Sequence, residues 1–361
     1  MLKIIDKYII KKYLSTFFFT ALMFSMIATI IDFSEKVENF IEEPVTKKQI
    51  FLEYYLNFIP YINGLLWPLF SLIAVVFFTS RMAYNTEIIP ILEAGVSFNR
   101  LLRPFMIGAG VLVVLLLIGN HFVIPNGNKY RLHFLHTYVW KNDDKGKTEN
   151  IHMFIGDGSK VFIKYYRKRD TIANEMRLET FKNGELSSIV EASTAKWMGY
   201  PNKWQLQDYR KRTFKGLKES LVVSSKSLDT VLNIVPEDFV RYNNQKEMMP
   251  TYELSRFISK EKERGLTPTQ NFELEIHRRT ADPASIFILT IIGVAVAARK
   301  VRGGMGLHLA IGIGLGAAFI VISRFSNTFV TNLNMPALIG VWIPNILFAI
   351  LGLYLVKRAQ Q

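Results

Sequence analysis

The sequence predicts an α-helical membrane protein with six transmembrane helices, arranged as three plus three. An all-β domain, an antiparallel sandwich or jellyroll-like roll, is inserted between the two groups. Half of the 361 residues are hydrophobic, and many gather in segments that approach the roughly 20 apolar residues needed to cross a bilayer. Between the third and fourth segments, apolar residues instead alternate in short runs separated by turn residues, as in antiparallel strands. The predicted spans are residues 13–31, 59–78, 104–124, 284–298, 307–323 and 337–356.

The segments divide the chain into four regions. An N-terminal membrane half (1–124) precedes the β domain (125–250), a helical return (251–282) and a C-terminal membrane half (283–361). In the β domain, Asn183-Gly184 and Pro201-Asn202 mark turns. The fourth span is short, so we expect it to continue a helix that begins upstream, after a stop at Gly265 and a cap at Thr267. No A-x-A-type cleavage site follows the first segment, which therefore predicts an uncleaved span.

Basic residues predict the orientation of the spans, because short cytoplasmic loops are rich in Lys and Arg. The N-terminus, the second loop, the fourth loop (299–302) and the tail carry twelve of them, whereas the opposite loops carry few. We therefore expect a multi-pass membrane protein with both termini cytoplasmic and the β domain external, which for the inner membrane of a Gram-negative bacterium means periplasmic. Residues 125–282 hold 28 basic and 21 acidic residues, half of the net charge of +14. Charge this dispersed does not favour a nucleic-acid partner.

The sequence shows no constellation typical of an enzyme or a cofactor site. Cysteine is absent, which excludes disulfides and thiolate metal ligands. Gly146–Thr148 reads "GKT", but a phosphate-binding loop would need a glycine where Lys141 stands. His121 and His308 lack partners at metal-binding spacing. We expect no catalytic residue, no metal and no cofactor.

The connection between the second and third spans, "NTEIIPILEAGVSFNRLLRP", is amphipathic. Asn85 or Thr86 can cap a short helix at about 85–95, Glu87 lies in its first turn, and Gly95 ends it. Its apolar residues share one helical face: Ile88, Ile91, Leu92 and Val96. Such a stripe either lies on the membrane surface or docks in a groove of a cytoplasmic protein. The pattern alone leaves both alternatives open.

Further landmarks of the chain are "IDKYIIKKYLSTF", "FVIPNGNKYR", "EIHRRTADP" and "GLHLAIGIGLGAAFIV". With these stretches and the connection quoted above, the chain resembles, over nearly its whole length, the lipopolysaccharide-export permeases of the LptF/LptG type, the membrane half of an ABC exporter. The resemblance implies that residues 85–95 form a coupling helix, with Glu87 contacting the ATPase and Gly95 as its turn. Pro90 departs from the family pattern, which predicts a helix that begins later or bends.

The resemblance also implies partners and a lipid-binding region. The partners are a cytoplasmic ABC ATPase dimer, a paralogous six-span subunit, periplasmic jellyroll proteins that form a bridge, and lipopolysaccharide itself. Lys36, just beyond the first span, matches a basic position that contacts the sugar-phosphate part of the lipid. Arg278 and Arg279 either clamp phosphates or pair with Glu275 on their own helix, and Arg324 is a further candidate.

Two points stay open in the sequence. Gly312 and Gly316 form a G-x-x-x-G pair that either packs helices closely or lines a lipid cavity. From the resemblance we expect a subunit of a lipopolysaccharide exporter that has no ATPase activity of its own. The alternatives are an ABC subunit that moves a periplasmic domain without passing lipid, and a membrane-anchored envelope enzyme. Which of the two paralogous subunits it is does not follow from the sequence.

Overall fold

The computed structural model of the chain describes residues 3–140, 149–156, 158–167, 170–182, 184–216, 218–238, 244–263, 269–298, 304–333 and 335–359. It divides into two compact units. The membrane unit comprises residues 1–139, 246–254 and 270–361, and the sheet unit comprises residues 140–245 and 255–269. Several sequence predictions fall outside the described residues: the Lys141 and Gly146–Thr148 stretch, Asn183, the Gly265 and Thr267 helix boundaries, and the basic fourth loop.

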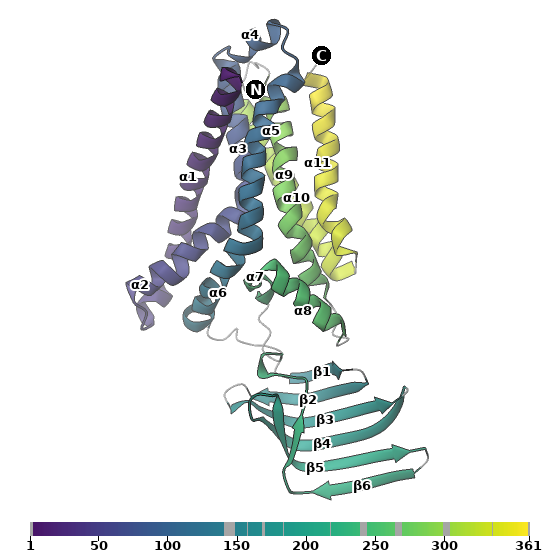
Figure 1. Cartoon of the computed structure of the whole chain (residues 1–361). Coiled ribbons are helices and arrows are strands. Elements are labelled where there is room, and N and C mark those ends of the chain that lie inside the picture. Colours follow the sequence, from purple (N-terminus) through teal and green to yellow (C-terminus); the bar gives the residue numbers. More distant parts are fainter. Residues whose placement is uncertain are drawn as a thin grey trace. The chain divides into compact units, whose positions relative to one another are not determined.

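Six helices in the described part of the chain are long and apolar enough to cross a membrane, which confirms the predicted number of spans. Most run well past the apolar segments, because helical hydrogen bonding continues into flanking polar residues on either side. In chain order they are α1 (Ile4–Glu42), α3 (Leu56–Tyr84), α5 (Phe98–Ile118), α9 (Gln270–Ala297), α10 (Gly304–Leu333) and α11 (Ala337–Ala359) (Figure 1).

Two of the spans are extended by short helices with π-helical turns. α2 (Lys47–Gln49) and the π-turn η1 (Ile50–Tyr55) lead into α3, while η2 (Gly119–Val123), α6 (Ile124–Phe134) and η3 (Leu135–Val139) continue α5. Pro125 is tolerated because it stands at the start of α6, where its missing N–H is least costly. Residues 125–139, placed by the sequence in the β domain, are therefore helical and belong to the membrane unit.

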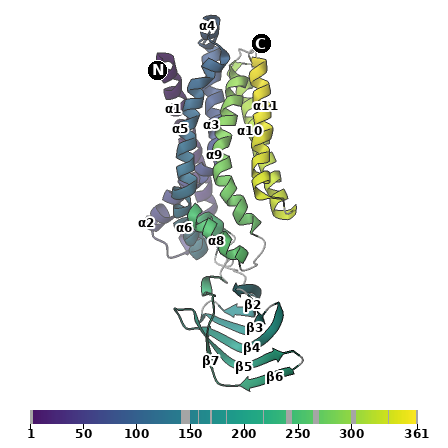
Figure 2. The same ribbon diagram turned by 45° about the vertical axis from the view of Figure 1, so that its right-hand side comes forward.

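Helix α9 forms the centre of the membrane unit and packs against α3, α5, α10 and α11 (Figure 2). Buried residues make up 61% of its most apolar stretch, against 17% for α1 and 22% for α10. Gly293 permits this packing, because a Cβ there would lie 2.3 Å from Val75 Cγ1. The apolar outer faces of α1 and α10 are left for lipid or for another protein.

The sheet unit is built around one antiparallel sheet of seven strands. They are β1 (Glu149–Gly156), β2 (Ser159–Arg167), β3 (Ile172–Lys182), β4 (Glu185–Trp197), β5 (Lys203–Lys215), β6 (Lys218–Ser224) and β7 (Leu228–Val231). β1 to β6 pair in sequence order, and β7 pairs with β5. This confirms the inserted β domain, which the sequence predicted as a sandwich or roll. The sheet itself is open. Alternating residues on one face bury a core around Trp204, whose indole N–H donates to the Ile234 carbonyl at 3.1 Å.

The chain returns to the membrane through three helices. α7 (Gln245–Met248) and α8 (Thr251–Glu263) precede α9, which begins at Gln270 and continues without a break through the fourth span. Pro283 lies inside α9. A single helix therefore joins the polar "ELEIHRR" stretch to the apolar span, and it places the charged residues at the membrane boundary.

Candidate functional site

A six-residue helix, α4 (Ile88–Glu93), connects α3 to α5 at one end of the membrane unit. Thr86 turns the chain with a φ of 59°, and Glu87 occupies the N-cap position. Pro90 is the third helical residue, where no intrahelical N–H bond is required. The departure from the family pattern at Pro90 is therefore accommodated in the first turn. Gly95, with a φ of 81°, follows the end of the helix.

The apolar stripe of α4 faces the core of its own chain. Ile88 is completely buried, and Ile91 and Leu92 are half-buried against the same core. On the other side Ile89, Pro90 and Glu93 are exposed or partly exposed. The stripe thus anchors α4 in the membrane unit, and a partner can reach only the opposite surface.

Polar contacts join both flanks of α4 to the start of α1. The hydroxyl of Tyr8 donates to Glu87 Oε2 at 3.5 Å, and Asn85 Nδ2 donates to Glu87 Oε1 at 3.3 Å. On the α5 side, Arg100 donates two hydrogen bonds to Asp6, at 2.8 and 2.7 Å. These contacts join the segments on both sides of α4 to α1.

A second candidate region is a cavity between α3, α9 and α10, at the end of the bundle opposite α4. Its wall includes Leu65 and Leu69 of α3 and Phe319 of α10. Its polar lining includes two of the predicted basic residues, Arg278 and Arg324, together with Ser323, Asn327 and Asp282. Arg278 Nε lies 3.2 Å from Asp282 Oδ2, and its Nη1 lies 3.8 Å from Glu275 Oε2. The cavity thus places two guanidinium groups, one of them paired with carboxylates, beside an apolar wall.

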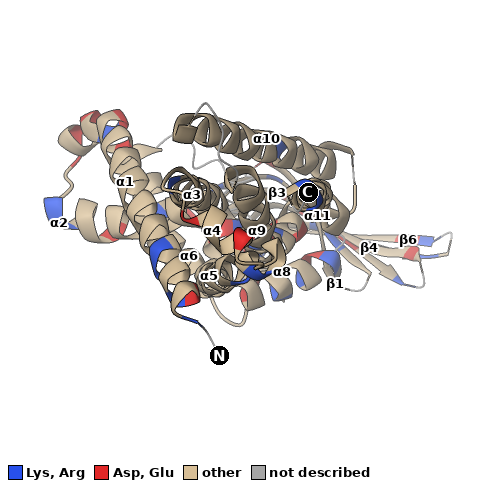
Figure 3. Ribbon diagram, turned by 90° about the horizontal axis from the view of Figure 1, so that it is seen from above, with Lys and Arg blue, Asp and Glu red and all other residues tan. Residues whose placement is uncertain are grey.

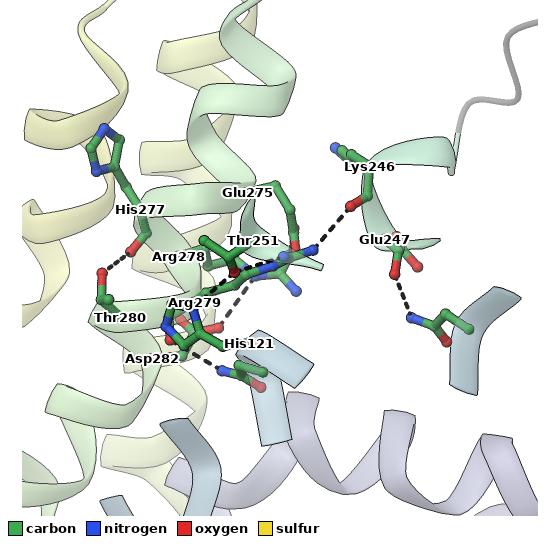
Figure 4. A network of polar contacts seen from close by, with 12 residues as sticks. His121, Lys246, Glu247, Thr251, Glu275, His277, Arg278, Arg279, Thr280 and Asp282 are labelled. Atoms are coloured by element: carbon green, nitrogen blue, oxygen red, sulfur yellow. Dashed lines mark hydrogen bonds and ion pairs between the residues drawn. The ribbon is translucent and has the colours of Figure 1, made fainter. Parts of the chain in front are cut away.

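The side chain of Arg279, the neighbour of Arg278, forms hydrogen bonds within the protein. This side chain is 3% exposed, and it donates to Glu275 Oε1 at 3.3 Å, to Thr251 Oγ1 at 3.0 Å and to the Lys246 carbonyl at 3.0 Å (Figure 4). These bonds hold α7 and the start of α8 against α9. The pairing with Glu275, one of the two alternatives left by the sequence, is present for both Arg279 and Arg278.

The same segment is also held by residues that the sequence did not single out. Arg131 of α6 is buried, lies 3.6 Å from Glu247 and places its guanidinium 3.8 Å from the centre of the Tyr61 ring. Burial raises the pKa of the Glu247 carboxyl above its ordinary value, and the charge of Glu275 raises it further. The guanidinium groups of Arg131 and Arg278 offset part of this rise, because nearby positive charge favours the ionised carboxylate. Spacing along the chain carried no signal for these contacts, because α6 and α7 are far apart in sequence.

A model of one protein family matches residues 7–358, nearly the whole chain, and is described as "Lipopolysaccharide export system permease LptF/LptG". The chain belongs to the LptF/LptG family. A similar relative is the lipopolysaccharide export system permease protein LptG of Haemophilus influenzae, 21% identical over the full length of both chains. The protein of that name from Escherichia coli K12 is 19% identical, with 98% of each chain covered.

Lys36, the basic position expected for LptF/LptG permeases beyond the first span, is bonded within the chain. It pairs with Asp32 one turn earlier on α1 and lies 5.7 Å from the centre of the Tyr54 ring. Asp32 also accepts hydrogen bonds from Tyr54 and Tyr55, at 3.0 and 3.4 Å. The Lys36 side chain is only 14% exposed, so a lipid phosphate would have to compete with Asp32 for it.

The two glycines of the LptF/LptG-like α10 stretch face α3. A Cβ at Gly312 would lie 3.0 Å from Val76, and one at Gly316 would lie 2.5 Å from Leu69. Gly316 also lines the cavity that contains Arg278 and Arg324, so packing and cavity lining coexist there. Within the described residues no group of three His, Asp or Glu side chains could hold a metal ion. His121 Nδ1 is instead within 2.8 Å of Thr251 Oγ1.

Proposed function

We propose that this chain is a transmembrane permease subunit of an exporter that extracts lipopolysaccharide from the inner membrane. The family match over residues 7–358 carries this proposal. The cavity between α3, α9 and α10 supports it, because an apolar wall beside Arg278 and Arg324 suits a lipid that joins acyl chains to anionic phosphates.

Power for export would come from a separate cytoplasmic ATPase dimer bound to the outer surface of α4. Both termini and α4 then lie in the cytoplasm and the sheet unit in the periplasm, as the basic loops predict. ATP-driven closure would push α4, and Ile88 would carry the motion into α3 and α5, because it is fully buried in the core to which both helices contribute. Movement of α3 against α10 would narrow the cavity and expel the lipid.

The remaining partners follow from surfaces left uncovered in a single chain. The apolar outer faces of α1 and α10 suit a paralogous six-span subunit, which would close the lipid pathway. The sheet is open, and its edge strand β6 exposes Leu221, Val222 and Val223 by 54–64%. An open edge offers unpaired backbone groups for strand addition, so we propose that periplasmic jellyroll proteins of the lipopolysaccharide bridge dock edge to edge with this sheet.

The cavity assignment is tested by the double variant Arg278→Gln, Arg324→Gln. Loss of two cations near a lipid phosphate is worth about 1 kcal/mol each, so the affinity of the purified complex for lipopolysaccharide should fall roughly 10- to 30-fold. A matched control replaces Lys48 and Lys129, two basic residues at the same end of the bundle outside the cavity. Equal affinity in both variants would remove the cavity from the pathway. It would favour a subunit that moves a periplasmic domain without passing lipid.

A further inference from the structure

A second groove lies between α1 and α3 at the α4 end of the membrane unit, away from the cavity that contains Arg278 and Arg324. Helix α1 contributes Tyr8, Lys12 and Phe19, and α3 contributes Phe77 and Arg81. Glu87, at the start of α4, also lines the groove. None of these five α1 and α3 residues lines the cavity of the lipid pathway proposed above.

Polar, charged and aromatic residues follow one another along both walls of the groove. On α1, Tyr8 is nearest the chain end, Lys12 follows one turn later, and Phe19 lies about two turns further into the bundle. On the antiparallel α3 the order from inside to outside is Phe77 and then Arg81. Each helix therefore contributes a cation and an exposed phenylalanine ring to the groove.

The cations of this groove are not neutralised by their neighbours. Lys12 and Arg81 are both exposed and form no ion pair among the residues that the structure describes. Glu87 is the one acidic residue in the described lining of the groove, and its two oxygens accept from Tyr8 and Asn85. Figure 3, which looks onto this end, shows the basic residues of the first turns of α1 in blue. The groove thus keeps a net positive charge against an aromatic surface.

We propose that this groove binds an anionic glycerophospholipid of the inner leaflet. Its phosphodiester would lie between Lys12 and Arg81, and an acyl chain would follow Phe19 and Phe77. A phosphate between Lys12 and Arg81 would relieve the repulsion between these two cations and draw α1 toward α3. The proposal rests on the orientation proposed above, with α4 in the cytoplasm, but not on lipopolysaccharide being the transported substrate.

The test is a titration of the delipidated, full-length chain with phosphatidylglycerol, followed by native mass spectrometry. The double variant Lys12→Gln, Arg81→Gln should bind this lipid roughly 10- to 30-fold more weakly than the parent chain. The matched control, Lys11→Gln, Arg103→Gln, removes two exposed cations from the same end outside the groove and should bind like the parent. Phosphatidylcholine should bind weakly to all three chains.

Several results would overturn the proposal. An equal loss of phosphatidylglycerol affinity in the groove and control variants would indicate general surface electrostatics. Equal affinity for phosphatidylcholine would show that the charge of the headgroup does not determine binding. If glycerol phosphate competed as well as the lipid, the ligand would be a soluble phosphate. A Phe19→Ser variant adds a further check, because it should weaken phosphatidylglycerol binding while Lys12 and Arg81 remain. If a protein partner fills the groove instead, the assembled complex should bind the lipid equally with and without the Lys12 and Arg81 substitutions.

Discussion

Replacing Arg279 by leucine is expected to destabilise the membrane unit by about 3–5 kcal/mol, the usual cost of removing one partner from a buried ion pair. The variant leaves Glu275 buried with its charge less compensated, and it removes the bonds to Thr251 and the Lys246 carbonyl. The return segment of α7 and the start of α8 would then be released from α9. The measurement is the midpoint of thermal unfolding in detergent, which should fall by several degrees.

A matched control for Arg279 is Lys129→Gln. Lys129 pairs with Glu253 in the same region at 3.3 Å, but both side chains are about 40% exposed, and exposed pairs contribute about 0–1 kcal/mol. Its midpoint should stay close to that of the parent. Equal midpoints for the Arg279 variant and the parent would contradict the structural role assigned to Arg279 and make it a candidate lipid contact again.

Reversing the charge at Glu87 is expected to stop transport while leaving lipopolysaccharide binding intact. In the Glu87→Arg variant a cation would replace the carboxylate proposed to contact the ATPase, and loss of a central charged contact commonly costs about 2 kcal/mol or more. Export by the variant complex should therefore fall at least about tenfold. The measurement is ATP-dependent release of lipopolysaccharide from proteoliposomes, with ATPase binding followed in parallel.

The Tyr8→Phe variant separates the two uses of Glu87. It removes the hydrogen bond within the chain but leaves the outward surface of α4 unchanged, so its transport should be close to normal. Normal transport by Glu87→Arg would rule out a coupling role for this residue. Equal defects in both variants would mean that Glu87 acts by holding α1.

The sequence predicted the elements better than it predicted their contacts. Six spans and an inserted β domain follow from hydropathy and alternation, which are local properties of the chain. The stripe of Ile88, Ile91 and Leu92 was also visible, but its pattern does not say what covers it. The structure covers it with the chain's own core.

The ion pairs divide in the same way. Asp32 and Lys36, like Glu275 and Arg279, lie one helical turn apart, so the spacing alone makes their pairing possible. Other contacts join helices that are distant in sequence. One is the ion pair of Arg131 with Glu247, and another is the cavity that Arg278 and Arg324 share. The sequence proposed Arg278 and Arg324 separately, from resemblance, and only the packing of α3, α9 and α10 places them at one cavity.

The most direct test of the exporter proposal is purification of the tagged chain from native membranes, with mass spectrometry of the bound proteins and lipids. The proposal predicts recovery of a P-loop ATPase, a second six-span chain and lipid A, with lipid A depleted in the Arg278→Gln, Arg324→Gln variant. A folded preparation that retains the ATPase and the second chain but carries no glycolipid would contradict lipid passage through this subunit.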